Sequence, residues 1–114
     1  MIEVSGIDSK MIANNIVPSE PVHPGEILKD ELESRGISQR AFAREIGLSP
    51  SLFNELVNGK RAFTTEYALL IEAALGIESD LWINMQTEYN KHVAVSNPTF
   101  LDRLKRIRNV AAFI

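Results

Sequence analysis

The sequence predicts an all-α protein, a bundle of five short helices around a helix-turn-helix motif, with an N-terminal arm and a C-terminal amphipathic helix. Three observations lead to this class. Apolar residues recur at helical spacing along most of the chain, glycine, proline or capping residues separate these runs, and no segment reads convincingly as a strand. With 114 residues, 45% of them hydrophobic, the chain can bury one core without metal or disulfide support.

The first elements along the chain are an arm and a helix. Residues 1–22 contain two short apolar patches followed by prolines, which disfavour helix immediately before them. The first regular helix is predicted to start at Pro24, because proline suits a first turn, and to end at Gly36. Its apolar face consists of Ile27, Leu28 and Leu32.

Two short helices follow, over residues 39–46 and 50–57, and three residues beginning with Gly47 separate them. Ser38 and Ser49 stand in front of them as N-caps. Two helices joined by a three-residue turn with glycine form the helix-turn-helix unit, whose second helix enters the major groove of DNA. The core shared by the two helices is expected to come from Ala43, Ile46, Leu48, Phe53 and Leu56.

Two more helices complete the predicted bundle. Thr64 or Thr65 caps a fourth helix that ends before Gly76, and Ser79 caps a fifth. The inward residues of the fourth are Ala68, Ile71 and Leu75. The fifth carries an apolar stripe that fits either the core or a seam between two copies of the chain. The candidate dimer interface on this stripe is Trp82, Met85 and Tyr89.

A sixth helix is predicted after Asn97-Pro98, with apolar residues on one side and basic residues mostly elsewhere. The formal charge is −2 over residues 1–22, −5 over residues 23–90 and +4 over residues 91–114. We therefore divide the chain into an arm (1–22), a helix-turn-helix domain (23–90) and a basic helical extension (91–114).

The outward face of the helix over residues 50–57 holds the candidate base-reading residues. The amide of Asn54 can pair with adenine through two hydrogen bonds, and the carboxylate of Glu55 can accept from cytosine or simply face solvent. The other outward residues are Ser51 and, just after the helix, Asn58. Candidate contacts to the flanking phosphates are Gln39, Arg40, Lys60 and Arg61, the last two of which also fit a solvated loop.

Composition points away from several other classes of protein. The chain has no cysteine, and His23 and His92 are far apart without the spacing of metal ligands. We therefore expect no metal, no cofactor, no small-molecule substrate and no catalytic residue. The N-terminal residues have neither the apolar core of a signal peptide nor the length of a membrane span, so a cytoplasmic location is expected.

Two segments resemble the HigA family of antitoxins, within the lambda-repressor-like (XRE-type) helix-turn-helix superfamily. They are HPGEILKDELESRGISQRAFAREIGLSPSLFNELVNGKR and ALLIEAALGIESDLWINMQTEYN. The resemblance implies a five-helix lambda-repressor-like bundle in a bacterial protein that dimerises, binds a palindromic operator in its own promoter and acts there on the nucleoid. It also implies a RelE-like (HigB-type) ribonuclease toxin as partner. By position, it assigns DNA reading to Ser49, Pro50, Ser51, Asn54 and Glu55, and a backbone contact to Gln39.

Two alternatives to a DNA-binding antitoxin stay open on the sequence. One is a free-standing repressor without a toxin. The other is a toxin-binding module with weak DNA binding, suggested by the acidic middle of the chain and by Glu55. The basic tail, residues 100–114, is hypothesised to contact the partner or DNA, the alternative being a helix packed on its own bundle.

Overall fold

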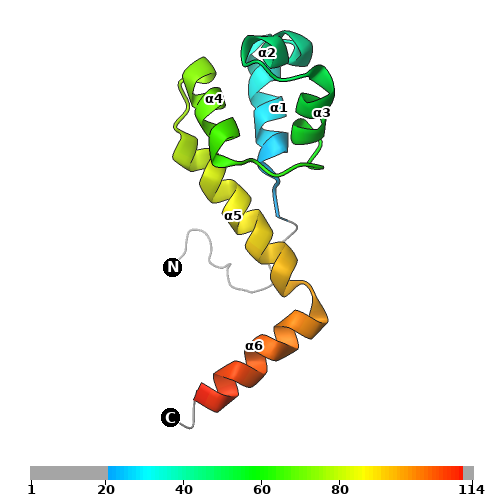
Figure 1. The fold of residues 1–114 in the computed structure, drawn as a ribbon, viewed down its shortest axis with the longest axis vertical. Helices are drawn as coiled ribbons and strands as arrows, with labels where there is room; N and C mark the ends of the chain where they lie inside the picture. The colour runs from blue at the N-terminus through cyan, green and yellow to red at the C-terminus, as the bar shows by residue number, and fades with distance from the viewer. Residues whose placement is uncertain (1–20, 112–114) are drawn as a thin grey trace.

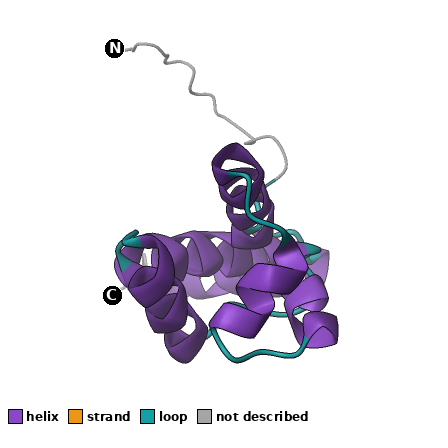
Figure 2. Ribbon diagram, turned by 90° about the horizontal axis from the view of Figure 1, so that it is seen from above, coloured by secondary structure: helices purple, strands orange, loops and turns teal. Residues whose placement is uncertain are grey.

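The computed structural model describes residues 21–111, and over this range it confirms the all-α prediction, with helices and connecting loops and no strand (Figures 1 and 2). The helices are α1 (Pro24–Arg35), α2 (Gln39–Glu45), α3 (Pro50–Val57), α4 (Thr65–Leu75), α5 (Ser79–Val95) and α6 (Pro98–Ala111). Apart from Pro21 and Val22, the predicted arm lies outside the described residues. None of these helices is both long and apolar enough to cross a membrane.

Side-chain caps start most of the helices where the sequence predicts them. Ser38, Ser49 and Thr64 accept hydrogen bonds from backbone N–H groups in the first turns of α2, α3 and α4. The prediction for α5 was wrong: Ser79 is its first helical residue, and no side chain caps the helix at its N-cap position. Instead the Ser79 N–H donates to the carboxylate of Glu72 at 2.9 Å, so a residue of α4 takes the role of the cap.

The core lies where α1 to α5 meet. Phe42 of α2 and Phe53 of α3 pack with ring centroids 5.5 Å apart, and Phe63 stacks on Trp82 of α5 at 5.8 Å. The buried hydrophobic residues are Leu28, Leu32, Phe42, Ala43, Phe53, Leu56, Val57, Phe63, Ala68, Ile71, Leu75 and Trp82. Each large side chain buried here contributes about 1.5–3 kcal/mol relative to exposure, so this shared core fixes α2 and α3 on the bundle.

One buried polar residue, Gln86, joins the loop before α4 to α5. Its side-chain oxygen accepts from the backbone N–H of Phe63 at 2.8 Å, and its amide donates to Asn90 at 2.9 Å. A buried backbone N–H without a partner would destabilise the fold, so Gln86 satisfies a group that the adjacent loop cannot. The apolar spacing of α5 gave no indication of this role.

The last two helices extend away from the helix-turn-helix. α5 runs through the boundary predicted at residue 90 and continues to Val95, and the chain then turns sharply into α6 (Figure 1). The main neighbour of α6 is α5, at the end far from α2 and α3. Within the described residues, α6 therefore contacts the bundle mainly through α5.

Candidate nucleic-acid interface

The turn between α2 and α3 is built as the helix-turn-helix spacing requires. Gly47 has φ +79°, a backbone conformation that residues with a Cβ adopt at a cost. Its N–H donates to the carbonyl of Arg44 at 3.2 Å, and the N–H of Leu48 donates to that of Ala43 at 2.9 Å. Ala43 is fully buried, so its small side chain lets the two helices approach closely.

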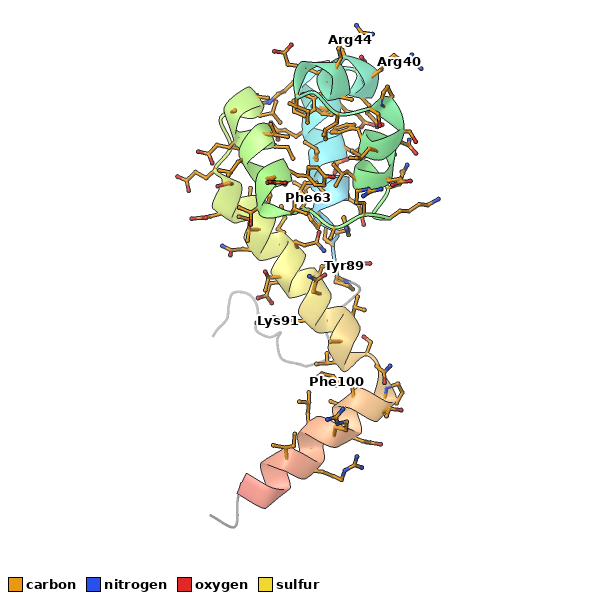
Figure 3. All side chains as sticks on the ribbon, viewed as in Figure 1. Arg40, Arg44, Phe63, Tyr89, Lys91 and Phe100 are labelled. Carbon is orange, nitrogen blue, oxygen red and sulfur yellow. The ribbon has the colours of Figure 1, made fainter. Side chains whose placement is uncertain are left out.

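The first turns of α2 and α3 enclose a shallow hollow of about 390 Å³, which we call the recognition hollow. It is lined by Gln39, Arg40, Pro50, Ser51 and Asn54. These residues come from two helices and were all predicted as site residues, and the fold brings them to one surface. Figure 3 shows Arg40 and Arg44 pointing outward at this end of the molecule, opposite to Phe100 of α6.

Glu55 and Arg61, predicted to contact DNA separately, are bound to each other. The guanidinium of Arg61 donates two hydrogen bonds to the Glu55 carboxylate, at 2.7 and 2.9 Å. These hydrogen bonds, and the attraction between the two charges, raise the pKa of Arg61. Both side chains are partly exposed, so the ion pair contributes little stability and can open in exchange for another anion.

The remaining predicted residues lie outside the recognition hollow. The hydroxyl oxygen of Ser49 accepts from the Leu52 N–H at 3.1 Å, so its first role is to start α3. Asn58 is the C-cap of α3, about 12 Å along the helix from its start, and faces a different cleft beside His23 and Tyr89. Lys60 is exposed in the turn that follows.

His23 has a structural role that the sequence analysis did not identify. Its side chain is only 4% exposed, and its Nδ1 accepts the N–H of Gly25 at 2.9 Å, which makes it the N-cap of α1. It packs edge-on against Tyr89 at 4.9 Å and Phe63 at 6.0 Å. Burial lowers the pKa of His23, which suits the neutral imidazole that an accepting Nδ1 requires. Its position directly before Pro24 was the available signal.

The predicted dimer residues on α5 fall into two groups. Trp82 is fully buried against Phe63 inside its own bundle, so of the two roles that the sequence leaves open for it, core and dimer seam, it takes the core role. Met85 and Tyr89 are half-buried and line a largely apolar groove of about 570 Å³ between α5 and residues 21–22. We call it the α5 groove; the apolar residues on its wall include Val22, Leu81, Met85 and Val95.

Within residues 21–111, no three or more histidine, aspartate or glutamate side chains lie together in a way that could hold a metal ion.

A helix-turn-helix family model matches residues 28–82 of the chain. The chain is 40% identical over 74 residues to virulence-associated protein I of Dichelobacter nodosus, covering 64% of this chain and 68% of that protein. It is 39% identical over 67 residues to antitoxin HigA-1 of Vibrio cholerae, covering 58% and 63% of the two chains. Among solved structures, Pseudomonas aeruginosa antitoxin HigA with the higBA promoter superposes with a TM-score of 0.64 at 34% identity, covering 67% of this chain and 84% of that one.

Proposed function

The chain belongs to the HigA antitoxin family of helix-turn-helix proteins, and from this premise we propose that it binds operator DNA through α3 and represses transcription there. This is a family of DNA-binding antitoxins and not of enzymes. The observation that carries the proposal is the recognition hollow, where polar side chains from the starts of α2 and α3 share one exposed surface.

Within the hollow, the side chains divide into two roles by their chemistry. Ser51 and Asn54 are exposed on the outward side of α3 and offer hydrogen-bonding groups to base edges in the major groove. Gln39 and Arg40 start α2, beside α3, and contact the phosphates that set the register of the helix in the groove. Pro50 has no N–H and shapes only the first turn of α3.

The Glu55–Arg61 ion pair adds a condition to this proposal. While it is closed, it cancels a positive charge next to a surface that must approach phosphates. On DNA, Arg61 exchanges Glu55 for a phosphate, and Glu55 becomes available to a cytosine amino group. The net charge of the two side chains is zero in both states, but the positive charge of Arg61 faces a phosphate only once DNA is bound.

Asn54→Ala tests the reading surface. We expect it to weaken binding to a fragment of the protein's own promoter by about 1–3 kcal/mol, because one bidentate base contact is lost, while binding to unrelated DNA changes little. Titrations on both DNAs at two salt concentrations measure this. Thr87→Ala, which truncates an exposed polar residue of α5, serves as the control. Equal losses on both DNAs would place base reading elsewhere.

We also propose that the protein acts as a homodimer on a palindromic operator. Two recognition helices must then lie one turn of DNA apart, about 34 Å. Met85 and Tyr89 remain candidates for the seam because the α5 groove that they line is open to solvent on one side.

The toxin-directed part of the proposal is that this chain, whose relatives are named antitoxins, neutralises a RelE-like (HigB-type) ribonuclease. Expressing the small open reading frame next to its gene should arrest growth, and co-expression of this chain should restore growth and co-purify the toxin. A neighbour that is not toxic, with operator binding intact, would support the alternative of a free-standing repressor.

A further inference from the structure

The large apolar side chains that stay exposed within residues 21–111 are not scattered. Of seven exposed large apolar side chains in this range, six lie on α5, on α6 or on the short segment before α1, and the seventh, Leu69, lies on α4. The six are Val22, Leu81, Val93, Val95, Phe100 and Ile107. Clustered apolar exposure of this kind marks a surface that is covered in the working protein.

The α5 groove is the concave part of this surface. It runs along α5 from Leu81 to Val95, a span of about 21 Å, with Val22 on the opposite wall. Its wall is mainly apolar, and Glu88, Lys91 and His92 add polar groups toward the C-terminal half of α5. An amphipathic helix of matching length would fill it.

The convex part of this surface is α6, which is itself an amphipathic helix of matching length. Its 14 residues span about 21 Å, and Phe100, Leu104 and Ile107 recur on one face at i, i+4 and i+7. Lys105 and Arg106 lie toward the opposite face by helical position. Ile107 is 61% exposed, so α5 leaves much of the apolar face of α6 uncovered. A helix of this length is marginal in water without packing.

The elbow between the two helices keeps α6 away from the groove of its own chain. Ser96 donates twice to the carbonyl of His92, from its hydroxyl at 2.8 Å and from its backbone N–H at 3.0 Å. Asn97 then starts α6, its side-chain oxygen accepting the Phe100 N–H at 3.0 Å. These bonds close the end of α5 and the start of α6, and the elbow between them leaves α6 angled away from α5 (Figure 1).

We propose that a second copy of the chain covers this surface, and that each copy seats its α6 in the α5 groove of the other. Length and charge favour this occupant: α6 spans about 21 Å, as the groove does, and carries a net charge of +3, whereas residues 23–90, which supply five of the ten residues that line the groove, carry −5. Residues 1–20, the competing occupant from this chain, carry −2. The exchange is reciprocal and closes a two-fold symmetric dimer. It deepens the homodimer proposed above and rests on that proposal.

Cross-linking tests the exchange directly, because the chain has no cysteine of its own. A full-length copy with a size tag carries Leu81→Cys, and an untagged full-length copy carries Ile107→Cys or Phe100→Cys. Two positions on α6 are used because the helix can lie in the groove in either of two orientations, which bring different ends of α6 close to Leu81. After mixing, a short bismaleimide should give a covalent tagged–untagged dimer. Lys105→Cys, on the opposite face of α6, should cross-link at least about tenfold less.

Three results would overturn the exchange. The first is cross-linking only within one chain when Leu81→Cys and Ile107→Cys are combined, which would mean that α6 folds back. The second is cross-linking of Leu81→Cys to Ile16→Cys instead, which would place the arm in the groove. The third is a dimer in solution that gives no tagged–untagged product with either α6 position.

A second measurement needs no cross-linker. Ile107→Glu should weaken self-association in sedimentation equilibrium by about 30- to 100-fold, because it puts a charge on the buried face of the exchanged helix. Thr99→Glu adds the same charge on the flank of α6, about 100° around the helix from Phe100, and should change self-association less than about threefold. Circular dichroism checks that both variants fold. Neither measurement uses DNA or toxin. A negative result would therefore contradict the helix exchange alone, while operator binding and toxin neutralisation are tested by the experiments given above.

Discussion

Gly25→Ala should lower the free energy of unfolding by about 3 kcal/mol or more, even though alanine is the better helix former by about 1 kcal/mol. A Cβ on residue 25 would lie 2.1 Å from the carbonyl oxygen of Leu56 and 3.0 Å from the backbone of Val57. All of these atoms are backbone, so no side chain can rotate to make room. α1 would have to move off α3, which opens the core beneath the recognition helix. Urea unfolding followed by circular dichroism measures the loss.

Gly47→Ala is the matched comparison, since nothing lies within 4 Å of the Cβ that it adds. Its cost comes only from the positive φ and should be about 1–2 kcal/mol. The two glycines are thus required for different reasons, close approach at residue 25 and backbone conformation at residue 47. A loss for Gly25→Ala no larger than that for Gly47→Ala would show that α1 and α3 can separate without cost.

Trp82→Ala should cost about 3–5 kcal/mol, because it empties a fully buried site stacked on Phe63. Trp82→Phe should cost less than about 1.5 kcal/mol. The indole N–H of Trp82 has no hydrogen-bond partner in the described part of the chain, and phenylalanine removes that unsatisfied group while keeping a ring. Thermal and urea unfolding of both variants give the comparison.

The phenylalanine variant also tests the place of Trp82. A residue inside its own bundle contributes no surface to a dimer, so Trp82→Phe should leave self-association unchanged. A phenylalanine variant as unstable as the alanine variant would mean that the indole N–H makes a hydrogen bond that matters.

Much of the candidate interface could be predicted from the sequence because it depends on local spacing. Caps, a three-residue turn and helical periodicity together place Ser51 and Asn54 on the outward side of α3. The Glu55–Arg61 ion pair could not be predicted in this way, since six residues and a turn separate the two side chains. Whether the two side chains meet depends on the path of the chain after α3, and local sequence patterns do not determine that path.

The helices, their order and most of their starts could be predicted from the sequence, because they follow from hydrogen bonds and contacts within one or two turns. Which apolar residues are core and which are surface depends on how the helices pack against one another. Trp82 and Leu81 are adjacent apolar residues of α5, yet Trp82 is fully buried and Leu81 is 46% exposed. The tertiary structure likewise placed Gln86 against the Phe63 N–H and held α6 away from its own bundle. Such outcomes depend on residues far apart in the chain meeting in space, and periodicity along one helix carries no information about its neighbours.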